Sequence, residues 1–304
     1  MRDEPAVRVV TDSTACLPDP ADLVEAGVLD DPAAGPLVVP LHVVTSDGER
    51  REGVDITPED VADRIARGER LTTSQPATEE FTRAFRGLVA GGARSVVSVH
   101  LSSALSGTVD SAARAGQRAM LPVRVVDSRS AAMALGFAAL EASRCAAAGC
   151  DTEHVARRAQ EVADSASAFF LVDSLDHLRR GGRLSAPAAA LGTALGVRPL
   201  LGLVDGRVDL VQRVRTRKAA MARLVDLAVE QAGRAARPAL AVHHLGAPER
   251  ADEVAAQLAE RVGTRPVVSP VSAVLGAHVG PGALAVVVVD RGTHVHDLEP
   301  GGPW

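Results

Sequence analysis

The chain reads SVVSVHLSSALSGT from Ser95 to Thr108, a stretch that joins a strand, a hydroxyl-rich turn and the start of a helix. Ser95–Val99 is a β-branched run of strand length, and Val123–Val126 is another. Each is followed by a serine-bearing turn and an Ala-rich segment that predicts a long helix. Earlier in the chain, Val7–Val10 and Val38–Val44 are also predicted strands. Short strands that alternate with helices predict a parallel sheet covered on both faces.

The second half of the chain has a different order of predicted elements. Ala168–Val172 is a predicted strand, and the strands around Asp205-Gly206 are predicted to form a hairpin, because that dipeptide favours a type I′ turn. A hairpin among crossover units predicts a mixed sheet. We therefore expect two α/β domains, residues 1–165 with a mainly parallel sheet and residues 166–304 with a mixed sheet. A ligand site is expected at their interface.

Two hydroxyl-bearing runs stand just ahead of predicted helices. Thr72–Pro76 and Ser102–Thr108 each offer hydroxyls and backbone N–H groups at a helix N-terminus. Such an arrangement is a receptor for a carboxylate or a phosphate. Helix capping is the alternative role for Thr73, Ser74 and Ser106, since Ser and Thr commonly fill cap positions.

Composition and charge exclude several classes of protein. The 304 residues carry a net charge of −5, which gives no electrostatic footprint for nucleic acid. Residues 1–5 lack the apolar core of a signal peptide. The most apolar stretch, Ala283–Val289, is too short to span a bilayer, so no integral membrane association is expected. Hydrophobic residues make up 46% of the chain and aromatic residues 2%, so the core and any pocket must be aliphatic.

The cysteines and the missing motifs narrow the chemistry further. Cys16, Cys145 and Cys150 form no metal-ligand pattern and leave an odd thiol, which fits a reduced cytoplasm. The chain contains no Gly-x-Ser-x-Gly elbow, no phosphate-binding loop and no dinucleotide fingerprint. We therefore expect no metal and no cofactor. The alternative kept open is a serine hydrolase of lipid esters, with Ser106 or Ser103, His278 and an aspartate.

Seven runs that occur in order along the chain resemble the signatures of the DegV family, over about residues 7–290. They are Val9–Pro18, Val39–Leu41, Thr72–Pro76, His100–Thr108, Leu178–Leu184, Val214–Ala219 and Gly276–Gly282. The resemblance implies a two-domain α/β fatty-acid carrier in the cytoplasm with no catalytic residue of its own. It implies two partners, a long-chain fatty acid and a separate kinase protein that phosphorylates the bound carboxylate.

The resemblance also implies roles for individual residues. Thr73 and Ser106 would hold the carboxylate. Three further residues would lie near it: Ser74, Ser103 and His278. Arg217 would lie near the carboxyl group or the phosphate that it later carries.

The basic run Arg179–Arg183 is expected to be a glycine-broken loop, which would ordinarily be a solvated surface. The resemblance implies instead that Arg179, Arg180 and Arg183 dock the kinase protein. The remaining polar candidates are given structural roles, with Asp12 and Asp127 forming turns and four histidines packed for structural reasons: His42, His100, His243 and His244.

Overall fold

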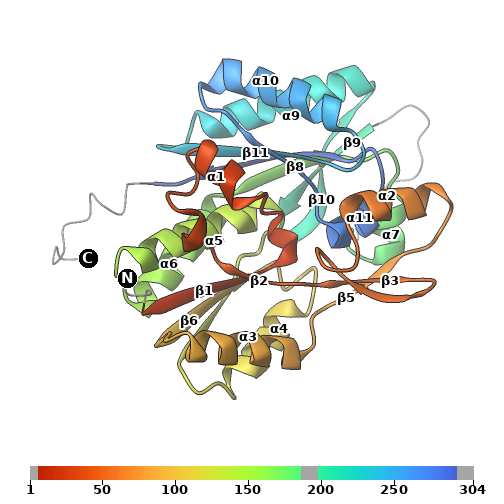
Figure 1. The fold of residues 1–304 in the computed structure, drawn as a ribbon. Coiled ribbons are helices and arrows are strands. Elements are labelled where there is room, and N and C mark those ends of the chain that lie inside the picture. The colour runs from red at the N-terminus through yellow and green to blue at the C-terminus, as the bar shows by residue number, and fades with distance from the viewer. Residues whose placement is uncertain (1–5, 186–197, 293–304) are drawn as a thin grey trace.

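The computed structural model describes residues 6–185 and 198–292, which form a layered α/β molecule (Figure 1). Two large sheets lie one above the other with a pair of helices between them. A further pair of helices covers the outer face of each sheet, and a small third sheet extends to one side. The predicted fold class, α/β with a parallel and a mixed sheet, is confirmed.

The parallel sheet has the order β2-β1-β6-β7. Its strands are β1 (Val7–Asp12), β2 (Leu37–Val39), β6 (Ser95–His100) and β7 (Val123–Asp127). Helices α3 (Thr78–Ala90) and α4 (Thr108–Gly116) cover its outer face, where Phe81 and Phe85 are buried. Because all neighbouring strands are parallel, the turns that follow β1, β6 and β7 emerge at one edge of the sheet.

The predicted single strand Val38–Val44 is wrong, because the chain leaves the sheet at Pro40. β2 ends at Val39, and β3 (His42–Thr45) belongs to the three-stranded sheet β4-β3-β5. Proline has no N–H to donate to a ladder, and the N–H of Leu41 donates to the Ser13 hydroxyl at 2.9 Å. The other strands of this sheet are β4 (Gly48–Arg51) and β5 (Thr72–Ser74).

The six-stranded mixed sheet has the order β10-β9-β8-β13-β11-β12. Its strands are β8 (Ser167–Leu171), β9 (Arg198–Val204), β10 (Arg207–Val214), β11 (Pro238–His244), β12 (Val267–Pro270) and β13 (Leu284–Asp290). The β9–β10 hairpin turns at Asp205 and Gly206, whose φ angles of 50° and 76° are those of the predicted type I′ turn. Helices α9 (Arg217–Ala232) and α10 (Pro248–Val262) cover the outer face.

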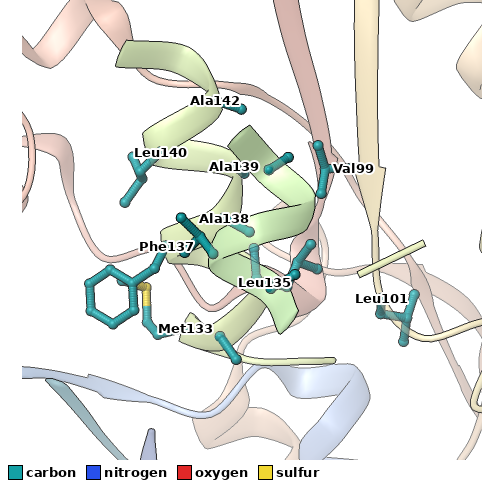
Figure 2. Packing of buried hydrophobic residues seen from close by; sticks show 14 of the residues in the cluster. Val99, Leu101, Met133, Leu135, Phe137, Ala138, Ala139, Leu140 and Ala142 are labelled. Carbon is teal, nitrogen blue, oxygen red and sulfur yellow. The ribbon is translucent and has the colours of Figure 1, made fainter. Parts of the chain in front are cut away.

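Helices α5 (Met133–Ala147) and α6 (Thr152–Ser165) form the middle layer. α5 is buried on nearly all sides, as expected for a helix that is apolar all round. It packs along α6 and against β1, and its apolar side chains, from Met133 and Phe137 to Ala142, point to several sides of the helix (Figure 2). One hydrophobic cluster contains residues of α5 together with residues of both large sheets, so the two halves of the chain share this part of the core. The domain boundary at residue 165 stays a prediction.

Three short helices pack beside the small third sheet. They are α2 (Pro58–Ala66), α7 (Asp176–Gly181) and α11 (Ala273–Val279). The N-cap of α2 is Thr57, which forms a reciprocal capping box with Asp60. The predicted loop at Arg179–Arg183 is wrong in its first half, because α7 continues to Gly181. It ends at Gly182, whose left-handed φ of 68° closes the helix.

The cysteines are paired differently from the sequence-based expectation of reduced thiols. Cys145, near the end of α5, forms a disulfide with Cys150, with the two Cα atoms 5.5 Å apart. Cys16 is a free thiol, and burial raises its pKa.

Candidate functional site

A cavity of about 380 Å³ lies between the mixed sheet, the small sheet and the loop that follows β6. We call this loop, Leu101–Gly107, the serine loop. Most of its wall is aliphatic, from Leu41, Leu101 and Leu178 to Val271 and Val287. Its polar side chains gather from β5, the serine loop and the α7–α11 region. They include Thr73, Ser74, Gln75, Ser106, Arg183 and His278. We call this group the hydroxyl end of the cavity.

Thr73 and His278 meet at the hydroxyl end. The Thr73 hydroxyl lies 2.8 Å from His278 Nε2. β5 carries Thr73, which pairs with Val43 of β3, while α11 carries His278. Burial, helped by the nearby charges of Arg183 and His177, lowers the pKa of His278 to about 4. The imidazole is therefore neutral at pH 7 and exchanges a single hydrogen bond with the hydroxyl.

Ser106 stands where the sequence predicted, immediately before the first residues of α4. Its hydroxyl lies 2.9 Å from the Thr108 hydroxyl. The N-cap residue of α4, Gly107, provides no side-chain cap. The first N–H groups of α4 thus receive no hydrogen bond from the side chain of the N-cap residue.

The expectation that Thr73 and Ser74 occupy a helix N-terminus is wrong. Both lie on strand β5, and the next helix, α3, begins only at Thr78. There the N–H of Ala77 donates to the Glu80 carboxylate at 2.9 Å. Ser74 donates to Glu49 in a short hydrogen bond. The hydroxyls of β5 thus reach the cavity from a strand.

A buried hydrogen-bond network holds the serine loop in place. The carboxylate of Asp12 accepts from the N–H of Leu101 at 3.0 Å, and its other contacts include His100 Nδ1 at 2.9 Å and the N–H of Thr14 at 3.1 Å. His100 also lies 2.7 Å from the Ser98 hydroxyl. Asp12 and His100 are fully buried, so they support the loop from below, in agreement with their predicted structural roles.

Two predicted site residues do not line the cavity. Ser103 is exposed, and its hydroxyl donates to Asp127 at 2.5 Å. Arg217, the first residue of α9, pairs with Asp173 beside a separate small hollow that also contains Arg198. Their predicted proximity to a carboxylate stays a prediction.

The three arginines of the basic run divide between surface and cavity. Arg180 is exposed and lies 3.2 Å from His177, and Arg179 forms a long ion pair of 3.8 Å with Asp176. Arg183 lines the cavity, and its Nε donates to the carbonyl of Leu105 at 3.1 Å. Arg183 therefore ties the serine loop to the segment that follows α7.

Two histidines that were expected to be structural also reach the cavity, His243 and His244. His243 Nε2 accepts from the N–H of Met133 at 3.2 Å, and burial lowers its pKa to about 4. Sequence gave no sign of this, because the partner N–H belongs to a helix 110 residues away.

Within residues 6–185 and 198–292, no three side chains with metal-ligand chemistry come together. In the same two ranges, no helix has the length and apolar character needed to cross a membrane.

This fold and this cavity define an α/β protein that encloses an apolar space with one polar end between its sheets. The chain belongs to the DegV family, whose model matches residues 6–291. It is 45% identical over 287 residues to a DegV domain-containing protein from Streptomyces coelicolor, covering 94% of this chain and 99% of that protein.

Solved structures of DegV family proteins share the fold. A DegV family protein from Thermus thermophilus, described for its fatty acid binding, superposes with a TM-score of 0.83 at 30% identity, covering 93% of this chain and 99% of that one. DegV from Bacillus subtilis, described as a fatty acid binding protein, gives 0.82 at 31% identity with the same coverage of both chains.

Proposed function

We propose that this chain binds one long-chain fatty acid, with its carboxylate at the hydroxyl end and its acyl chain along the aliphatic wall. The observation that carries the proposal is the cavity itself, whose wall is mainly apolar, with hydroxyl groups gathered where Thr73, Ser106 and His278 lie. Relatives with the same fold that are named for fatty acid binding support it.

An acyl chain gains enough from burial to bind such a cavity. Each buried methylene contributes about 0.8 kcal/mol, so a sixteen-carbon chain gains on the order of 11 kcal/mol before the costs of immobilisation. Over most of its length, the acyl chain would contact apolar side chains of the cavity wall. Apolar burial thus supplies the affinity.

The hydroxyl end can satisfy a carboxylate largely with neutral donors. Thr73, Ser106 and the N–H groups at the start of α4 are uncharged, and the low pKa of His278 keeps its ring neutral. Arg183 is a charged residue of the cavity wall, and its Nε already donates a hydrogen bond to the carbonyl of Leu105. A carboxylate held mainly by neutral donors keeps its nucleophilicity, which a later phosphoryl transfer requires.

The position of the hydroxyl end suits presentation of the carboxylate to another protein. Gln75 is exposed, and Thr73 and Ser106 are partly exposed, whereas Val287 on the opposite part of the wall is buried. We propose that a separate kinase phosphorylates the carboxylate at this opening. Two arginines of α7, the exposed Arg180 and the partly exposed Arg179, would dock an acidic surface of that kinase.

The hydrogen bonds of the site favour a carrier over a serine hydrolase. A catalytic triad needs a hydrogen bond between its serine and its histidine. Here Ser103 donates to Asp127 instead, and His278 bonds to Thr73. Incubation of the pure protein with acyl esters separates the two functions. A carrier releases no free acid, whereas steady turnover that is lost in Ser106→Ala would favour the hydrolase.

Recognition of the carboxylate is tested by comparing palmitate with its methyl ester. We expect the ester to bind at least tenfold more weakly, because it cannot accept the charge-assisted hydrogen bonds of the hydroxyl end. Isothermal titration calorimetry measures both. Equal affinities would show that the hydroxyl end does not hold the carboxylate.

A further inference from the structure

The inner face of the mixed sheet forms the floor of the cavity. Side chains alternate along a strand, and Phe170, Ala285 and His243 all point to this face and line the cavity. They form one row across three neighbouring strands, because Ala285 pairs with Phe170 on one side and with His243 on the other. Since adjacent strands lie about 4.8 Å apart, this first row places an alanine between two ring side chains.

A second row lies farther from the hydroxyl end. Val287 pairs with Ala168, and both residues line the cavity. The direction follows from the connections: α7 follows the end of β8, and α11, which carries His278, precedes the start of β13. An acyl chain that starts at the hydroxyl end therefore meets the first row before the second.

The two rings that flank Ala285 are held in place. His243 is fully buried, with Nε2 accepting from Met133 and Nδ1 3.1 Å from the Ser269 hydroxyl, and Phe170 is only 9% exposed. Ala285 itself is partly exposed although β13 is an inner strand of the sheet. The small methyl side chain at position 285 thus leaves an open passage between two fixed rings.

We propose that Ala285 determines acyl-chain length specificity: the passage over it admits the distal part of a long chain to the second row at Ala168 and Val287. This inference rests on the proposed function. An acid short enough to end before the first row does not depend on position 285, whereas a longer acid must cross it.

The test measures the affinities of Ala285→Leu for octanoate, decanoate, laurate, palmitate and stearate by calorimetry. Because each excluded methylene forfeits its burial, we expect octanoate to bind within about twofold of wild type and stearate about a hundredfold more weakly. Ala168→Leu, beyond the passage, should weaken stearate while sparing laurate. If Ala285→Leu fails to fold, Ala285→Val should show the same trend to a smaller extent.

Two control variants accompany the series. Val286→Leu enlarges the next residue of β13, which does not line the cavity, and should leave the length profile unchanged. Ala285→Gly keeps the passage open and should retain stearate. The inference is overturned if Ala285→Leu binds stearate as wild type does, or if it weakens octanoate and stearate equally. A wild-type chain that binds none of these acids would instead overturn the proposed function.

Discussion

The hydroxyl of Thr73 and the imidazole of His278 meet at 2.8 Å although 205 residues separate them. The pair depends on space as well as on chemistry, because Gly181 passes so close to His278 Nδ1 that a Cβ atom there would collide with the ring. Thr73 and His278 are thus brought together by two different elements, β5 and α11.

Removal of the Thr73 hydroxyl tests its role directly. Thr73→Val keeps the shape of the side chain but loses the donor, and we expect palmitate binding to weaken by about 1–3 kcal/mol, the usual cost of losing a hydrogen bond to a charged group. Ser106→Ala should behave similarly. Thr73→Ser, which restores the hydroxyl, should bind close to wild type, and calorimetry distinguishes these results. Wild-type affinity in Thr73→Val would show that the Thr73 hydroxyl does not bind the carboxylate.

The buried histidines predict how stability changes in acid. Burial lowers the pKa of His243 to about 4, against about 6.5 for an unperturbed histidine. Below pH 6.5 the unfolded chain binds a proton that the folded chain refuses, so the free energy of unfolding should fall as the pH drops towards 4. The share of His243 is at most about 3 kcal/mol at pH 4.

Urea denaturation at a series of pH values measures this effect. His243→Gln can still accept from the N–H of Met133 but does not titrate, so its stability should fall less steeply between pH 6.5 and 4 than that of wild type. Glu52 acts in the opposite direction, because burial raises its pKa to about 7 and its contribution is lost as the pH rises. Parallel curves for wild type and His243→Gln would contradict the buried neutral imidazole.

At the scale of elements, the sequence predicted those parts of the fold that local chemistry decides. The strands predicted at Val7–Val10, Ser95–Val99 and Val123–Val126 and the Asp205-Gly206 turn were predicted correctly, because each depends on neighbours in the chain. The break at Pro40 was missed, because a run of β-branched residues hides the change of sheet. The second half of α7 was predicted to belong to the loop Arg179–Arg183, because two glycines, at 181 and 182, stand where the helix ends.

The site shows the same division between local and long-range information. The motifs identified Thr73, Ser74, Ser106 and His278, all of which line one cavity. The sequence could not place Arg183 in the wall or Arg217 outside it, since both positions depend on how α7 and α9 pack. Nor could it show that His243 faces the cavity, because that depends on the register between strands.

Gly181→Ala tests the fit between α7 and α11. The added Cβ would displace the His278 ring, so we expect palmitate affinity to fall by about tenfold or more while the fold is retained. Gly87→Ala is the matched control, because Gly87 is exposed in α3 with open space around it. That variant should bind as wild type and gain up to about 1 kcal/mol of stability. Unchanged affinity in Gly181→Ala would mean that His278 does not contribute to binding.

At the scale of the whole molecule, the exposed arginine of α7, Arg180, and the cavity arginine, Arg183, should have separable effects. Charge reversal in Arg180→Glu should abolish acyl-phosphate formation with the cognate kinase yet leave palmitate affinity nearly unchanged, because exposed charges act on encounter and orientation. Arg183→Ala should weaken palmitate binding, because Arg183 lines the cavity and holds Leu105. The proposed docking surface would be wrong if Arg180→Glu lost the acid and kept the kinase.

Native mass spectrometry of the purified protein, followed by analysis of the extracted lipid, tests the central claim most directly. The cavity and its hydroxyl end predict one fatty acid per chain, released as a free long-chain acid when the protein unfolds. A chain that carries no lipid, and whose melting temperature does not rise when palmitate or oleate is added, would contradict the account.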